Sequence, residues 1–414
     1  MENVEFDVIV IGGGIMGSCT AYQAAKRGLR TLLLEQFDFL HHRGSSHGES
    51  RINRATYPKQ YFTKMALAAE PLWREAEAEI GYSVYFRTPQ LDMCPATNKR
   101  LQAVVSSCRN TSLPVRVLDP KQVKEQFDGR FHLPEDWVGV VTEFGGVIKA
   151  TKAVSMFQSL AVKHGATLRD HVEVNGVERD DRTGGISVTA KNGDKFLGKK
   201  CVVTVGAWAQ KLVKTITNGR MVLPIQPLET NVSYWRIKPG HEEEFTIGSG
   251  FPVFASYGIP YVYGTPSFEY PGLLKVGWHG GPECEPDRCT FAPSASAQTS
   301  LKQWIEERFG GKVDSSAPVM SQSCMYSMTP DEDFVIDFLG GKFGKDVVVA
   351  GGFSGHGFKM GPLIGQILAD LVSTGSSTNS PGLDPFRIDR FKENRIGGVS
   401  ASLVILQESS EIIK

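Results

Sequence analysis

The fold is decided by residues 6–35, FDVIVIGGGIMGSCTAYQAAKRGLRTLLLE. Residues 6–11 form a short apolar, β-branched run, which is typical of a strand that is buried on both faces. A helical pattern follows and stops at Gly28, and residues 31–34 then form a second buried strand. Because Glu35 stands at the carboxyl end of that strand, the stretch predicts a complete βαβ unit.

The glycines of the first turn have the G-x-G-x-x-G spacing of a dinucleotide site, with Gly12, Gly14 and Gly17 as its members. Gly12 makes the tight turn, Gly14 lets the backbone approach a pyrophosphate, and Gly17 lets helix and strand pack closely. The helix N-terminus offers free N–H groups to phosphates. Glu35 can accept hydrogen bonds from ribose hydroxyls, and its charge disfavours a 2′-phosphate. The unit predicts an adenine dinucleotide; the alternative is a glycine-rich turn in an ordinary α/β unit.

The composition is that of an ordinary globular protein. The 414 residues are 41% hydrophobic and 22% charged, and 45 basic residues balance 45 acidic ones. This balance gives no electrostatic reason to expect nucleic acid or a membrane surface, and no apolar run has the length of a membrane span. The acidic N-terminus is not typical of a signal peptide. Seven scattered cysteines indicate a reducing compartment without disulfides, and no metal site is predicted.

Further patterns predict an α/β protein, α+β overall. Short β-branched runs at 201–205 and 346–350 end in glycine and resemble further parallel strands of the first sheet. Residues 232–276 are rich in Tyr, Phe, Pro and Gly, which predicts an antiparallel sheet with turns. Helical periodicity is found at 62–80, 152–164, 300–309 and 363–373.

These elements predict a Rossmann-like domain that is interrupted by an antiparallel-sheet substrate domain. The Rossmann-like, cofactor-binding domain is expected at 1–85, 145–215 and 325–390. The inserted substrate domain is expected at 86–144 and 216–324, and residues 391–414 are expected to form a polar C-terminal tail.

A second strand, glycine turn and helix are predicted at 346–372. Lys359 lies near the start of the helix expected from about Gly361, and a cation beside the positive helix end suggests an anion such as a substrate carboxylate. The alternative is a solvent-facing lysine. Arg51 and Arg54 lie three residues apart, which we interpret as one helix face, and guanidinium forks suit a carboxylate. The alternative is a pair of surface or structural arginines.

Two further places carry polar groups beside predicted strands. Alternation puts Lys275 and His279 on one face with Gly277 between them, which suggests a cavity lining if that face is buried. An exposed strand face is the alternative. Cys324 precedes an apolar strand at 334–337, and by itself a lone cysteine indicates a small buried hydrophobe.

Together these motifs resemble the monomeric sarcosine oxidase family of flavin amine oxidases, which includes N-methyltryptophan oxidase and L-pipecolate oxidase. The resemblance runs from Asp7 to about Thr374 and depends on several motifs in the same order. The matching stretches are 7–17, SHGESR at 46–51, GAW at 206–208, KVGWH at 275–279, CMY at 324–326 and GFSGHGFK at 352–359.

The resemblance implies FAD that is attached covalently through its 8α-methyl carbon to Cys324. Arg54 and Lys359 match the residues that hold the substrate carboxylate, and Lys275 matches a lysine that assists the reaction with oxygen. The remaining matches are His279 and Tyr326 beside the substrate, His47 and Arg51 beside the isoalloxazine ring, and Gly355, Gly357 and Phe358 in the second glycine turn at the cofactor.

The implied activity is oxidation of a secondary amino acid: sarcosine, another N-methyl amino acid or L-pipecolate. A hydride equivalent passes to FAD, and O2 reoxidises the flavin with release of hydrogen peroxide. We expect a monomer whose partners are a small-molecule amino acid and O2. The peroxide product suggests a cytoplasmic or peroxisomal protein, although residues 412–414 are not a standard peroxisomal tripeptide.

Three alternatives remain at this level. An NAD-linked amino-acid dehydrogenase would also use the βαβ unit, and a flavin-binding module without catalysis would share the glycine turns. A related flavin amine oxidase could act on another substrate, such as a glycated amino acid. Residues 56–61 and 261–263 depart from the family pattern, so the choice of substrate is expected to depend on them.

Overall fold

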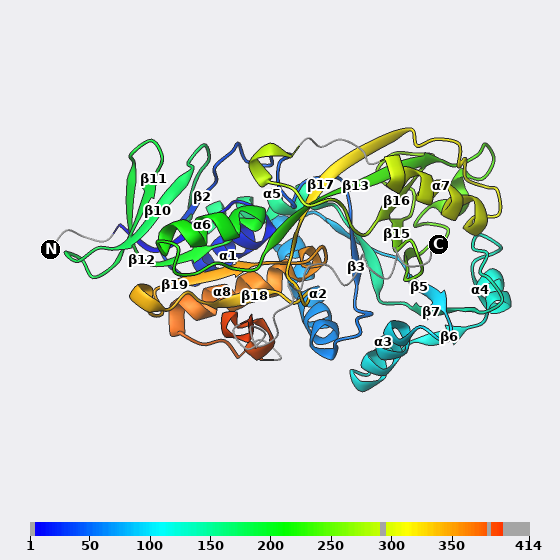
Figure 1. The fold of residues 1–414 in the computed structure, drawn as a ribbon, viewed down its shortest axis with the longest axis horizontal. Coiled ribbons are helices and arrows are strands. Elements are labelled where there is room, and N and C mark those ends of the chain that lie inside the picture. Colours follow the sequence, from blue (N-terminus) through cyan, green and yellow to red (C-terminus); the bar gives the residue numbers. More distant parts are fainter. Residues whose placement is uncertain (1–4, 290–294, 379–381, 392–414) are drawn as a thin grey trace, which may run out of the picture.

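The computed structural model describes residues 5–289, 295–378 and 382–391. Two large sheets follow one another along the long axis of the molecule (Figure 1). The first contains the N-terminal βαβ unit, and the second contains the Tyr- and Phe-rich strands of the middle of the chain. This mixed α/β architecture confirms the predicted fold class.

The first sheet has eight strands, in the order β10-β11-β12-β1-β2-β9, with β19 paired to β12 and β18 paired to β19. Its strands are β1 (Phe6–Ile11), β2 (Thr31–Leu34), β9 (Thr167–Arg169), β10 (Val174–Arg179), β11 (Ile186–Ala190), β12 (Lys195–Val203), β18 (Val335–Phe338) and β19 (Val347–Gly351). The pairs β1–β2, β1–β12, β2–β9 and β12–β19 are parallel. The parallel strands predicted at 201–205 and 346–350 are therefore confirmed.

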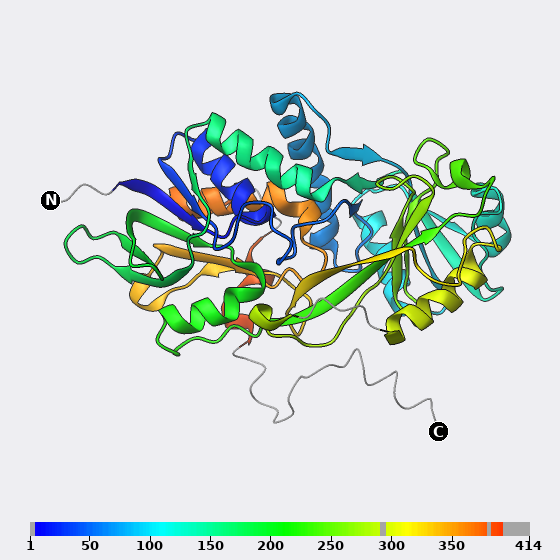
Figure 2. The same cartoon turned by 90° about the horizontal axis from the view of Figure 1, so that it is seen from above.

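The two faces of β1 bury different cores, as a strand inside a doubly covered sheet requires. Val8 and Val10 pack into a core with four helices, and Ile9 and Ile11 pack into a core on the opposite face. The helices of the first core are α1 (Ile15–Lys26), α2 (Gln60–Ile80), α5 (Ala150–Lys163) and α8 (Gly361–Thr374). Helix α6 (Ala209–Ile216) covers the other face, and Figure 2 shows the sheet between these layers.

The second sheet also has eight strands, in the order β17-β13-β16-β15-β14-β5-β7-β6. Its strands are β5 (Gln90–Pro95), β6 (Arg116–Leu118), β7 (Trp137–Thr142), β13 (Gln226–Arg236), β14 (Val253–Ser256), β15 (Val262–Thr265), β16 (Leu273–Trp278) and β17 (Met320–Met328). Neighbours are antiparallel except β14 and β5. Phe254 of this sheet stacks on Trp304 of α7 (Ala295–Arg308), with ring centroids 5.6 Å apart.

A three-stranded sheet, β3 (Arg51–Arg54), β8 (Gly145–Ile148) and β4 (Tyr85–Arg87), completes the strands of the described chain. The interpretation of Arg51 and Arg54 as one helix face is therefore wrong. Residues 51–54 pair with β8 instead, which supplies the backbone hydrogen bonds that a four-residue helix could not make for itself. Side chains three apart on a strand point to opposite faces.

The remaining helices are short or lie at the edge of the second sheet. They are α3 (Lys99–Asn110), α4 (Pro120–Gln126) and the 3-10 turns η1 (Gly206–Trp208), η2 (Glu242–Phe245), η3 (Pro286–Arg288), η4 (Gly341–Phe343), η5 (Phe358–Met360), η6 (Asp384–Phe386) and η7 (Ile388–Phe391). Across the described parts of the chain, no helix combines the length and apolarity that crossing a bilayer requires.

The four predicted helices are confirmed as α2, α5, α7 and α8. Strand β17, which contains Cys324, was missed because Ser and Gln interrupt its apolar pattern. The expected tail at 391–414 lies, after Phe391, outside the described residues. The domain limits proposed from sequence stay a prediction.

Helix α1 begins so close to the turn after β1 that Gly17 has no room for a side chain. A Cβ there would lie 1.8 Å from the carbonyl oxygen of Gly12 and 2.7 Å from Thr204 Oγ1. We expect Gly17→Ala to push α1 off the sheet and to lower the free energy of unfolding by about 3 kcal/mol. Thermal or urea unfolding measures this change.

The matched control is Gly248→Ala, because a methyl group at Gly248 meets only Thr246 Oγ1, at 3.7 Å. This control should unfold like the parent protein. A Gly17→Ala protein as stable as the control would contradict the close packing of α1 on β1.

Candidate cofactor site and active site

One large cavity joins the glycine turn of β1 and α1 to the strands of the second sheet. At one place it is lined by Gly12, Gly14 and Glu35, which were predicted to hold a dinucleotide. The cavity also reaches the other predicted catalytic, substrate-binding and cofactor-binding residues, which lie on or next to β3, β16 and β17 or in the turn before α8. These groups are His47, Arg51, Arg54, Lys275, His279, Cys324, Tyr326, Gly355, Gly357, Phe358 and Lys359.

The dinucleotide end of the cavity is organised by Glu35, which is 5% exposed. Its Oε2 accepts a hydrogen bond from the Gly13 N–H at 2.7 Å, and its Oε1 accepts one from the Phe37 N–H at 3.0 Å. The N–H of Ile15, at the start of α1, donates to Ser46 Oγ at 3.0 Å. Glu35 thus braces the glycine turn, and a carboxylate retains further lone pairs for a ribose hydroxyl.

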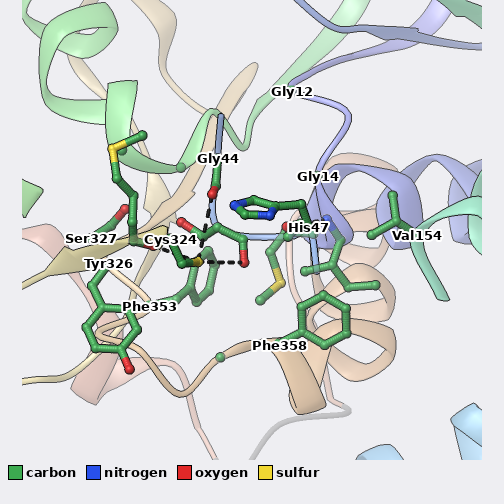
Figure 3. Close-up of a pocket in the computed structure, with 18 of the residues that line it drawn as sticks. Gly12, Gly14, Gly44, His47, Val154, Cys324, Tyr326, Ser327, Phe353 and Phe358 are labelled. Carbon is green, nitrogen blue, oxygen red and sulfur yellow. Dashed lines mark hydrogen bonds between the residues drawn. The ribbon is translucent and has the colours of Figure 1, made fainter. Parts of the chain in front are cut away.

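Cys324 is half-buried in the middle of β17. The guanidinium of Arg51 donates to its Sγ, with Nη2 at 3.6 Å. Figure 3 shows the Cys324 sulfur facing the Gly44 carbonyl oxygen, 3.9 Å away, with His47 and Phe358 on the same cavity. The structure thus places Cys324 on the cavity wall and not in a hydrophobic core.

His47 is buried beside Arg51, and it is the clearest sign that the cavity is made for a ligand. Both of its ring nitrogens lack a hydrogen-bond partner within the described residues. Buried polar atoms are normally satisfied, so these nitrogens indicate a polar group that comes with a ligand. Burial, followed by the charge of Arg51, lowers the pKa of His47 to about 3, so the ring is neutral.

Arg54 lies where β3 leaves the three-stranded sheet, and its side chain is buried in the cavity wall. Its guanidinium stacks on the ring of Tyr57 at 4.3 Å and donates to the carbonyl oxygen of Thr56. Arg51 and Arg54 do not share a helix face, but both side chains line the same cavity. Arg51 lies beside Cys324, and Arg54 lies beside Tyr57.

Lys359 lies in η5, one turn before α8, and is buried and not solvent-facing. Its Nζ donates to Tyr57 Oη at 2.9 Å and to the His356 carbonyl oxygen at 2.7 Å. Burial, together with the nearby charge of Arg54, lowers the pKa of Lys359 well below its usual value. Tyr57 therefore joins the two cations, since it also stacks on the Arg54 guanidinium.

Lys275 is buried, His279 is half-buried and both line the cavity, so the alternative of an exposed strand face is wrong. Lys275 donates to Ser50 through its Nζ, at 3.0 Å to the carbonyl oxygen and 2.9 Å to Oγ. The ring of His279 lies between Tyr261 at 4.6 Å and Tyr326 at 5.3 Å. Burial lowers the pKa of His279 to about 4, so it is neutral above that pH.

The comparison with protein families decides the cofactor. Residues 7–371 match the model of the DAO family, described as FAD dependent oxidoreductase. The chain belongs to this family. FAD is therefore the dinucleotide, and the NAD-linked alternative is set aside.

Relatives in this family span nearly the whole chain. A protein described as a probable sarcosine oxidase from Arabidopsis thaliana is 59% identical over 398 residues, covering 96% of this chain and 95% of its own. Peroxisomal sarcosine oxidase of Homo sapiens is 35% identical and covers 93% and 96%. The amino acid oxidase NikD has a TM-score of 0.79 at 23% identity, covering 93% of this chain and 98% of its own, which shows the same fold.

The residues present fit FAD at two points along the cavity. The unpartnered nitrogens of His47 supply polar atoms for a ligand beside Cys324. The second glycine turn comes close to the aromatic wall: Gly355 has φ +72°, and a Cβ there would lie 2.9 Å from the Tyr326 ring. A bulkier residue at this position would therefore narrow the cavity.

Sequence reasoning missed several residues that complete the site. Tyr57 lies in the stretch 56–61, which was singled out only as a departure from the family, and Ser46 and Ser50 were quoted without a role. These residues could have been found from their position in the sequence, because they lie close to the predicted histidine and arginines. Tyr263, which also lines the cavity, lies in the stretch 261–263, which was likewise singled out only as a departure from the family. Glu269 carried no signal in the sequence, because only the pairing of β15 with β16 brings it to Lys275.

Proposed function

We propose that the protein is an FAD-dependent oxidase of secondary amino acids, with sarcosine, other N-methyl amino acids and L-pipecolate as candidate substrates. One observation carries the proposal. Arg54 and Lys359 are 8% and 5% exposed, and neither forms an ion pair with a carboxylate of the described residues. The buried carboxylate of Asp92 acts on Arg54 without forming an ion pair with it, and the charges that act on Lys359 are those of Arg54 and Arg51. Since buried charges are normally paired, the carboxylate of an amino acid supplies the missing close partner.

The neighbouring groups suit a neutral secondary amine. With the carboxylate on Arg54 and Lys359, the amine lies toward the wall of His279, Tyr261 and Tyr326. His279 is neutral at physiological pH, so it does not repel a developing positive charge on the substrate nitrogen. Contacts at two points on the carboxylate orient the reacting C–H bond. Such orientation of the substrate accounts for a large part of the rate increase in many enzymes.

FAD held in this cavity would supply the acceptor for a hydride equivalent from the substrate and would pass the electrons to O2. For sarcosine the balanced reaction consumes O2 and water and yields glycine, formaldehyde and hydrogen peroxide. Gly12, Gly14, Gly17 and Glu35 are assigned to the adenosine diphosphate half of FAD. The flavin half is assigned to His47, Arg51, Lys275, Gly355, Gly357 and Phe358.

Covalent attachment of FAD through Cys324 is part of this proposal. All seven cysteines lie in the described residues, and Cys324 is the one that lines the cavity. Four of the others are buried in the hydrophobic cores or beside them. Cys284 and Cys289 are half-buried outside the cavity lining.

A substrate panel tests the activity. We expect anaerobic bleaching of the flavin and peroxide formation in air with sarcosine, other N-methyl-L-amino acids or L-pipecolate. N-methyl amines that lack a carboxylate should fail, because they leave Arg54 and Lys359 unpaired. Stopped-flow absorbance and a coupled peroxide assay measure the two steps. Oxidation of D-amino acids alone, or of amines without a carboxylate, would contradict the proposal.

We also propose a monomer located in the peroxisome or the cytoplasm. The sequence resembles the monomeric sarcosine oxidases, and the human relative is named as peroxisomal. Sedimentation of the holoprotein and imaging of a tagged full-length chain in cells test the two statements. A stable dimer, or exclusive secretion, would overturn them.

A further inference from the structure

A buried carboxylate, Glu269, faces the ammonium group of Lys275. Its Oε1 lies 3.8 Å from Lys275 Nζ, and the two side chains are 2% and 4% exposed. That Oε1 has no hydrogen-bond partner within the described residues. Because both groups are removed from water, the attraction between them is screened far less than that of a surface ion pair.

The hydrogen bonds of Lys275 go elsewhere. Ser50 accepts two of them, at its carbonyl oxygen and its Oγ. An ammonium has three N–H groups, so one remains for a group in the cavity that Lys275 lines. Glu269 thus supports the charge of Lys275 without forming a hydrogen bond with it.

The other charges that act on Lys275 have smaller effects than Glu269. The groups that act on its ammonium, besides Glu269, are Arg51 on β3, Glu49 before β3, Cys324 on β17, His47 and the Tyr234 ring of β13, which lies 5.7 Å away. Arg51 opposes the protonated form, whereas Glu269 is its largest support. Burial still lowers the pKa of Lys275 to about 8, so its charge is sensitive to the loss of any support.

We propose that Glu269 is a positioning residue that keeps Lys275 protonated beside the flavin, and so maintains the reaction of the reduced flavin with oxygen. This inference rests on the proposed function, in which Lys275 assists oxygen. A positive charge at this place stabilises the negative charge that develops when O2 accepts an electron. Glu269 itself does not line the cavity and acts only through Lys275.

The test is the reoxidation rate of Glu269→Gln holoenzyme as a function of pH. The flavin is reduced photochemically with oxalate as the electron donor, without any amine, and is then mixed with oxygenated buffer. We expect the pKa of Lys275 to fall by about one unit, which lowers the reoxidation rate about tenfold at pH 9 and less than twofold at pH 6. Reduction by sarcosine at pH 7 should change far less.

Two comparisons isolate the effect. Glu49→Gln removes an exposed carboxylate that also acts on Lys275, and its pH profile should match the parent because water screens it. In a Lys275→Met background, Glu269→Gln should have no further effect on reoxidation, since the two residues act as one unit.

A pH profile of Glu269→Gln that coincides with the parent would overturn the proposal. An equal loss in flavin reduction and in reoxidation would also overturn it, because that pattern indicates a general structural role. If Glu269→Gln does not fold, Glu269→Asp keeps the charge and should give a smaller shift in the same direction. Photoreduction needs no amine, so the reoxidation test does not depend on the substrate. A substrate panel without activity would therefore contradict the proposed oxidase function and leave the result for Glu269 valid.

Discussion

We expect replacement of Cys324 by serine to release the flavin from the denatured protein. We expect acid precipitation of the parent to leave the yellow colour in the pellet, whereas Cys324→Ser leaves all of it in the supernatant. The reason is geometric: Cys324 is the cysteine that lines the cavity, and Arg51 holds its sulfur there with Nη2 at 3.6 Å. Serine is nearly isosteric, so the protein should still fold and bind FAD through Gly12, Gly14 and Glu35.

The control is Cys284→Ser, which changes another half-buried cysteine outside the cavity lining. Its pellet should stay yellow. Mass spectrometry of a tryptic digest then locates the flavin on the peptide that contains Cys324. Acid-stable flavin in Cys324→Ser, or none in the parent, would disprove the covalent assignment.

We expect removal of the charge of Lys359 to weaken substrate binding strongly and to change the stability of the fold little. We expect Lys359→Met to lower kcat/KM for the amino acid roughly a hundredfold to a thousandfold, which corresponds to about 3–4 kcal/mol for a charge-assisted contact with a carboxylate. The stability should behave differently. Lys359 is buried without an ion pair among the described residues, so replacing it with an apolar side chain removes an unfavourable buried charge.

The free energy of unfolding of Lys359→Met should therefore fall by less than about 1 kcal/mol, or rise, while activity is lost. Steady-state peroxide assays and urea unfolding of the holoprotein measure the two quantities. Lys59→Met is the control, because Lys59 is 40% exposed and paired with Asp333 at 2.8 Å. A parallel loss of stability and activity in Lys359→Met would argue that Lys359 only supports the fold.

The predicted dinucleotide end and the predicted substrate end of the site differ in how well they could be predicted from the sequence. At the dinucleotide end, Gly12, Gly14 and Gly17 are close in sequence, and their task is local: a strand, a turn and a helix start. Local rules therefore predicted their place. At the predicted substrate end, the structure places Arg54 on the cavity, where its contact with a carboxylate stays a prediction. The expected helix was wrong, because strand pairing with β8 is a long-range choice that a four-residue pattern cannot express.

Cys324 and Glu269 were even harder to place from the sequence, because their positions also depend on long-range strand pairing. Physical reasoning from the sequence favoured a buried hydrophobic role for Cys324, and only the family resemblance pointed to the flavin. The structure adds the reason for its position, since β17 pairs with β13 and turns the cysteine toward Arg51. Glu269 carried no pattern at all, yet it lies against Lys275 because the chain reverses between β15 and β16.

By itself, the sequence determined the βαβ unit of residues 6–35, the parallel strands that extend its sheet, and the need for a dinucleotide, because these depend on short-range periodicity and on glycines at fixed spacing. Only the tertiary structure decided which distant side chains meet: Arg54 with Lys359 through Tyr57, Arg51 with Cys324, and Glu269 with Lys275. The physical reason is that charge, burial and hydrogen bonding act through space. The folded chain brings together groups that are far apart in sequence, such as Arg54 and Lys359, which are separated by 305 residues (359 − 54).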